Sequence, residues 1–171
     1  MTSTEKLTGW LSGRLPADWF TAAPDITRDR DEILIVGALP EPTYPDGATD
    51  EAKAAAVAGR IRQFREDTRG RRIEIARELE SATDQKVSWG VTCAGKQEVF
   101  TSLAAPVMTR LRQSERQVLD TLVEAGVARS RSEAVAWCVR LVAEHADTWL
   151  TELHAAMEGV RTVRDAGPDL G

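Results

Sequence analysis

The sequence predicts an α+β fold, in which a small three-stranded sheet, antiparallel or mixed, and one long helix are followed by a C-terminal helical hairpin and an extended last helix. Three patterns lead to this prediction. Residues 32–39 (EILIVGAL) are apolar on both faces and rich in β-branched residues, which is typical of a central strand. Apolar and polar residues alternate over 86–93, and apolar residues recur every three or four positions from 118 onward. We therefore expect two regions, 1–105 and 106–171.

The first region should begin with a short helix that leads toward the strand at 32–39. Leu7, Trp10 and Leu11 supply its apolar side, and Gly13 marks its end. Three prolines within residues 40–45 then impose a loop. A long helix is expected from about residue 50 to 82, because these residues form one apolar stripe: Ala54, Val57, Ile61, Phe64, Thr68, Ile75 and Leu79. Gly70 is where we expect this helix to kink or break, since glycine costs about 1 kcal/mol there relative to alanine.

Two strands should follow the long helix. Residues 86–93 alternate with period two, residues 94–96 make the turn, and 97–103 return as the partner strand. Pro106 ends the sheet and suits the first turn of a helix, and Met108 and Leu111 would continue the apolar face of that helix.

The C-terminal region predicts a helix, a tight turn and a second helix over 118–142 (VLDTLVEAGVARSRSEAVAWCVRLV). Gly126 can supply the left-handed residue that ends the first helix. Ser130 and Glu133 form an S-x-x-E capping box that starts the second. The apolar stripe continues to Val160, so the last helix should reach beyond residue 160 or bend near Asp147. Such a long stripe on so small a chain predicts self-association.

This segment resembles the two helices of ribbon-helix-helix DNA-binding proteins, in which a turn of the form GxxxSRSEA is common. The resemblance implies a homodimer in which a strand from each copy forms a ribbon that enters the major groove of DNA, while the start of the second helix binds a phosphate. The ribbon would be the strand 99–103, with Thr101 on it, although the same strand can instead pair inside its own sheet. Phosphate contacts would come from these residues: Arg110, Arg112, Arg129, Ser130, Arg131 and Ser132.

Charge is unevenly distributed along a chain whose net charge is -5. Residues 60–77 carry seven arginines against three acidic residues, which suits a surface that meets a polyanion. A second hypothesis is therefore an RNA- or ribosome-associated factor whose helix presents Arg62, Arg65, Arg69 and Arg72 to structured RNA. A third is an antitoxin-like or scaffold protein that binds a partner protein through an exposed tryptophan, Trp137 or Trp149.

The sequence carries none of the motifs that would indicate an enzyme. Phosphate-binding loops, the dinucleotide-binding glycine turn and the nucleophile elbow are all missing, so we predict a non-enzymatic protein with no cofactor and no small-molecule substrate. His145 and His154 are nine residues apart and do not have the spacing of a zinc pair. The longest apolar run is seven residues, and the first fifteen residues contain charges, so we expect neither a membrane span nor a secretory signal. We therefore interpret the chain as a cytoplasmic regulator from a bacterium.

Overall fold

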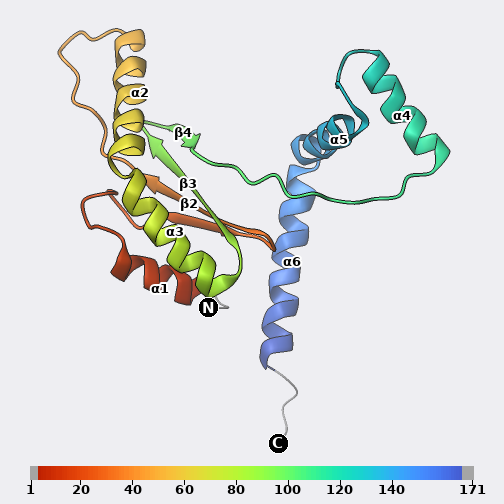
Figure 1. Ribbon diagram of the computed structural model, residues 1–171, viewed down its shortest axis with the longest axis horizontal. Coiled ribbons are helices and arrows are strands. Elements are labelled where there is room, and N and C mark those ends of the chain that lie inside the picture. The colour runs from red at the N-terminus through yellow and green to blue at the C-terminus, as the bar shows by residue number, and fades with distance from the viewer. Residues whose placement is uncertain (1–3, 167–171) are drawn as a thin grey trace, which may run out of the picture. The chain divides into compact units, whose positions relative to one another are not determined.

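The computed structural model describes residues 4–166 and divides the chain after Pro106 into two compact units. The N-terminal unit holds the sheet and three helices, and the C-terminal unit holds three more helices (Figure 1). The predicted α+β class is confirmed. So is the short leading helix, which is α1 (Thr4–Arg14).

The sheet has four strands where three were predicted. They are β1 (Asp25–Arg28), β2 (Glu32–Ala38), β3 (Lys86–Cys93) and β4 (Lys96–Val99), in the order β1-β2-β3-β4. β2 and β3 are parallel, while the two outer pairs are antiparallel, so the sheet is mixed and β2 is an inner strand as predicted. β1 escaped prediction because its four residues, DITR, are too few to establish an alternation.

Two helices, α2 (Asp50–Asp67) and α3 (Arg69–Thr83), cross from β2 to β3. The sequence predicted a kink or break at Gly70. The break between the two helices falls instead at Thr68. Thr68 donates both its N–H, at 3.1 Å, and its hydroxyl, at 2.5 Å, to the carbonyl oxygen of Phe64. The Arg72 guanidinium binds the carbonyl oxygen of Arg65 at 2.7 Å and the Thr68 hydroxyl at 3.0 Å. Side-chain hydrogen bonds thus satisfy the backbone at the break, which glycine cannot do.

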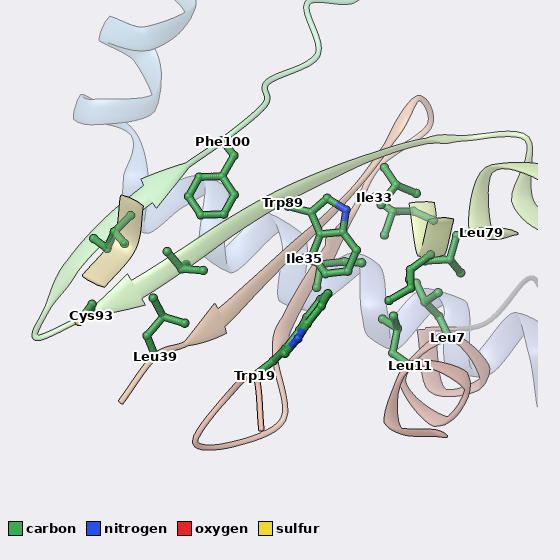
Figure 2. Close-up of a cluster of buried hydrophobic side chains, with 14 of the residues drawn as sticks. Leu7, Leu11, Trp19, Ile33, Ile35, Leu39, Leu79, Trp89, Cys93 and Phe100 are labelled. Carbon is green, nitrogen blue, oxygen red and sulfur yellow. The ribbon is translucent and has the colours of Figure 1, made fainter. Parts of the chain in front are cut away.

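The main core lies between one face of the sheet and helices α1, α2 and α3 (Figure 2). The strand register places Ile33 beside Val87 and Ile35 beside Trp89 on that face. Fully buried residues from all three helices cover them: Leu7, Leu11, Ile61, Ile75 and Leu79. The aromatic residues Trp19, Phe64 and Trp89 meet edge to face at centroid distances of 5.5 to 6.1 Å.

Gly37 on β2 makes room for an aromatic ring. A Cβ atom at this position would lie 2.1 Å from Cε1 of Phe20, a distance that no packed side chain tolerates. The absence of a side chain therefore allows Phe20 to lie directly against the strand.

The C-terminal unit contains the predicted helical hairpin, formed by α4 (Gln113–Glu124) and α5 (Arg131–His145). Gly126 follows α4 with φ of 73°, as expected of the left-handed residue beyond a helix end. The hairpin closes on a small buried cluster of Leu119, Ala128 and Ala134. The last helix, α6 (Asp147–Ala166), is separated from α5 by Ala146, which agrees with the predicted bend near Asp147.

The helix predicted to start at Pro106 does not form. Residues 101–112 have no regular secondary structure, and Met108 is 96% exposed. α4 begins only where the Glu115 carboxylate accepts the N–H of Arg112 at 2.6 Å, which caps the helix there. Upstream of Leu111, the described segment packs no side chain against the buried cluster. A further helical turn would therefore gain no stability from burial of apolar surface.

Candidate nucleic-acid interface

The N-terminus of α5 is an exposed helix start. Ser130 has extended backbone angles, and its hydroxyl accepts the N–H of Glu133 at 3.2 Å. The Glu133 carboxylate reaches one residue further than in the predicted capping box and accepts the N–H of Arg129 at 2.8 Å. Ser130 and Ser132 are both exposed. In the described chain no side chain caps the N–H groups of Arg131 and Ser132, so they carry the partial positive charge of the helix end.

Arg131 is held by a carboxylate and does not point freely to solvent. Its Nε and Nη2 donate to the two oxygens of Asp120 on α4 at 2.6 and 2.7 Å, a bidentate pair that joins the two helices. The pair raises the pKa of Arg131, and it lowers the pKa of Asp120 chiefly through these hydrogen bonds. Arg131 was predicted to bind phosphate, but in this structure its charge is already matched. Asp120 lies eleven positions away in the chain, and no local sequence pattern signals this pairing.

Three other predicted cationic residues are exposed without such a neighbour. Arg129 immediately precedes the Ser130 cap, and within residues 4–166 its guanidinium has no ion pair. The guanidinium groups of Arg110 and Arg112 are likewise exposed and without an ion pair in the described part of the chain. These three side chains are among the exposed cations of the C-terminal unit, which also include Arg140.

The strand predicted as the ribbon is used inside the N-terminal unit. Phe100 donates its N–H to the carbonyl oxygen of Trp89 at 2.7 Å, which extends the pairing of β4 with β3 by one residue. The Thr101 hydroxyl accepts the Trp89 N–H at 3.5 Å. Leu103 donates to the Glu32 carboxylate at 3.2 Å. One edge of residues 99–103, Thr101 included, is therefore already occupied inside the chain's own sheet, in which β4 is the last strand. This is the alternative that the sequence left open.

A different segment is unpaired. Within residues 4–166, no hydrogen bond holds the backbone of residues 104–110, which run as an extended trace ahead of α4 (Figure 1). Val107 is 90% exposed and Met108 96% exposed. Leu111, by contrast, is half-buried against the cluster of the helical unit. The segment is thus anchored at Leu111 and open along its length.

An apolar groove lies beside this anchor, between α4 and α5. Its volume is about 360 Å³, and its walls are Leu111, Glu115, Val118, Leu119, Val135, Cys138, Val139 and Val142. Val118, Val139 and Val142 are more than half exposed in the chain as described. These three large aliphatic side chains form an exposed apolar patch on the helical unit.

In a comparison with known proteins, each of the two units matches a protein-family model. Residues 5–99 match the family model described as "Rv1265-like protein, N-terminal domain", and residues 112–164 match "Mb1296 C-terminal domain". The chain belongs to the Rv1265-like family. It is 52% identical over 161 residues to "Uncharacterized protein Rv1265" of Mycobacterium tuberculosis strain H37Rv and to "Uncharacterized protein Mb1296" of Mycobacterium bovis, covering 94% of this chain and 70% of each relative. No solved structure matches the chain.

The N-terminal domain of this Rv1265-like chain carries the four arginines predicted to bind RNA, of which three are exposed and one is buried. Arg62, Arg65 and Arg69 are exposed, and Arg65 lies 3.8 Å from the Glu98 carboxylate. Arg72 is only 7% exposed, so its place in the predicted RNA face was wrong. Burial and the charges of Arg65 and Arg69 lower the pKa of Arg72.

The position of Arg72 was readable in the sequence. It lies four residues after Thr68 and three before Ile75, on the apolar stripe of the helix. Its guanidinium stacks over the Phe100 ring, 4.8 Å from the ring centroid. A charged residue on an apolar stripe is the signal that this arginine belongs to the core.

The described residues of this Rv1265-like chain hold few other groups with a chemical role. Cys93 borders a shallow cavity of about 310 Å³ at the carboxyl ends of β2 and β3, and burial raises the pKa of its thiol. Within residues 4–166, no three histidine, cysteine, aspartate or glutamate side chains meet as a metal site. In the same residues, no helix has the length and apolar character to cross a bilayer. Trp89 is buried in the core, Trp137 is half-buried, and Trp149 is 60% exposed.

Proposed function

We propose that the chain is a cytoplasmic, non-enzymatic DNA-binding protein that works as a homodimer through a ribbon-helix-helix unit formed by residues 107–145. One observation carries the proposal: an unpaired, exposed segment lies directly ahead of a helical hairpin whose second helix has an open N-terminus. Both cysteines are free, which suits a reducing compartment.

A second copy would complete the ribbon and the groove together. An exposed strand with unpaired N–H and C=O groups is a template for another strand, and residues 107–110 offer such an edge. Leu111 anchors this strand and also lines the apolar groove. Pairing the two strands antiparallel about a twofold axis would bring the valines that line each groove toward the other copy. Strand pairing and groove burial are therefore parts of a single interface.

This placement of the ribbon supplies the base-reading residue that 99–103 lacks. Side chains alternate across a strand, so Thr109 lies on the side of the inward Leu111, while Met108 and Arg110 lie on the opposite, outward side. Arginine can donate two hydrogen bonds to O6 and N7 of guanine in the major groove. Arg110 is exposed and unpaired in the described chain, as that contact requires.

Phosphate contacts would come from the start of α5. The uncapped N–H groups of Arg131 and Ser132 and the helix dipole favour an anion there. Arg129 adds a free cation one residue before the cap. Arg131 in this scheme positions α5 through Asp120 and does not act as a phosphate ligand itself.

Two other functions keep a specific observation in their favour. Exposed Arg62 and Arg69 have no ion pair among residues 4–166, which favours binding to structured RNA. Trp149, at 60% exposure, favours docking of a partner protein in an antitoxin-like or scaffold role.

Paired charge reversals separate DNA binding from RNA binding. One variant carries Arg110→Glu with Arg129→Glu, and its matched control carries Arg62→Glu with Arg69→Glu, so both change the net charge equally. Each is titrated against random-sequence duplex DNA and against ribosomal RNA over a range of salt concentrations. Loss of DNA binding in the first variant alone supports the proposal. Loss of RNA binding in the second variant alone replaces it with the RNA function, and a parent that binds neither polymer at about 50 mM salt refutes both.

A further inference from the structure

The last helix carries an apolar stripe that its own unit does not cover. Every described side chain from Asp147 to Val160 is exposed. The stripe consists of these residues, from 38% to 68% exposed: Trp149, Leu150, Leu153, Met157 and Val160. An isolated helix gains little stability in water unless it buries an apolar face, so a 20-residue helix with such a stripe calls for a partner.

The spacing of the stripe is that of a helix that packs on another helix. From Ala146 the apolar positions 150, 153, 157 and 160 follow in steps of four, three, four and three. At about 100° per residue these positions stay on one side of the helix, as at the a and d positions of a coiled coil. We call this row of apolar side chains, Leu150, Leu153, Met157 and Val160, the seam of α6. Its aliphatic composition suits packing against another helix with an aliphatic face.

The charges of the helix distinguish the two ways in which identical copies can pair. Its first turn is acidic at Asp147, and its last turn is basic at Arg164. Parallel copies would set each charge against its own duplicate. In an antiparallel pair centred near Ala155, Leu150 faces Val160 of the second copy and Leu153 faces Met157. The same register brings Asp147 within a turn of Arg164 at both ends, so apolar and charged positions agree on one alignment.

We propose that α6 pairs antiparallel with α6 of a second copy of this chain. This contact is separate from the ribbon and groove of the proposed DNA-binding dimer, and it does not require them. It gives the chain a second means of self-association, so that DNA-binding units are joined through their last helices.

The test uses the full chain with the ribbon disabled by Thr109→Pro, because proline blocks strand pairing in the 107–111 segment. In this background, Leu153→Glu with Met157→Glu places two charges on the seam. The matched control, Thr151→Glu with Ala155→Glu, places two charges at the same spacing on the opposite side of the helix. Molar mass is measured by sedimentation equilibrium at tens of micromolar, with circular dichroism to report helix content.

The Thr109→Pro chain and its control variant should sediment as dimers, and the seam variant should fall twofold to the mass of a monomer. A monomeric Thr109→Pro chain would overturn the proposal, as would a seam variant that remains dimeric. The first result would mean that α6 meets its own chain or a different partner. DNA binding by the parent chain is measured in a separate experiment. If the parent does not bind DNA, the sedimentation result still decides whether α6 pairs with a second copy.

Disulfide trapping tests the direction of pairing. In a Cys138→Ala background, a chain with Leu150→Cys should cross-link to a chain with Val160→Cys only when the two are mixed. Cross-linking of Leu150→Cys chains among themselves would show a parallel pair and overturn the antiparallel alignment.

Discussion

The sharpest test of the proposed DNA contact is the difference between two arginines that lie two residues apart. Arg129 has no ion pair in the described chain, whereas Arg131 is bound bidentately to Asp120. Replacing Arg129 with alanine should therefore remove a phosphate contact. Replacing both members of the pair, with Asp120→Asn and Arg131→Gln, leaves the net charge of the site unchanged and should remove none.

The magnitude follows from counterion release. Each phosphate contact contributes about −0.9 to the slope of log binding constant against log salt concentration. A homodimer contains two copies of Arg129, so Arg129→Ala should reduce the slope by about 1.8. Between about 50 and 200 mM salt, this difference shrinks the affinity advantage of the parent over the variant roughly tenfold. The salt slope of the Asp120→Asn, Arg131→Gln variant should differ from that of the parent by less than about half of the 0.9 expected for one phosphate contact.

Fluorescence anisotropy of a labelled duplex, titrated at several salt concentrations, measures all three slopes. Circular dichroism of each variant shows whether the hairpin remains folded. An Arg129→Ala chain with the slope of the parent would refute the assignment of a phosphate to the start of α5. A paired variant that loses as much slope as Arg129→Ala would show that Arg131 leaves Asp120 to bind DNA.

Three predictions concern stability. Arg72→Ala should lower the free energy of unfolding by about 2–3 kcal/mol in urea denaturation, because two charge-assisted hydrogen bonds and the ring contact are lost; a change under about 0.5 kcal/mol would contradict its buried role. Gly37→Ala should cost about 1–3 kcal/mol by overpacking, and Phe20→Leu in the same chain should recover part of it; no recovery would exclude this clash. The lowered pKa of Asp120 makes its pair with Arg131 stabilising above the unfolded pKa of about 3.9 and ineffective as the pH falls through the folded pKa. The difference in melting temperature between the parent and Asp120→Asn should therefore be full at neutral pH and vanish in strong acid, and a difference that persists there would contradict the pairing.

Several elements were predictable because neighbouring residues determine them. Alternation over 86–93 located β3, the apolar run located β2 as an inner strand, and Gly126 marked the turn of the helical hairpin. Ser130 was identified as the cap of α5, which it is. Each of these features depends on interactions between residues within about four positions of one another, and such interactions can be inferred from the local sequence.

The choice between two candidate ribbons could not be made in that way. Residues 99–103 and 107–111 both suit an extended strand, and no local pattern says which of them pairs with β3. The sheet decides, because the turn at Ala94 and Gly95 sets the register that carries Phe100 onto Trp89. The same limit explains why β1 was missed, since its pairing with β2 and not its composition makes it a strand.

The sequence by itself located the inner strands β2 and β3, the short leading helix, the helical hairpin and the cap of α5, and it named the arginines that are candidates for an anionic partner. Tertiary structure alone decided which of those charges are free. Arg131 lies opposite Asp120, whereas Arg129 stays in solvent. The physical reason is distance: secondary structure follows from contacts between near neighbours, but the neutralisation of a charge depends on whichever group the fold brings within a few ångströms, however far away it lies in the chain.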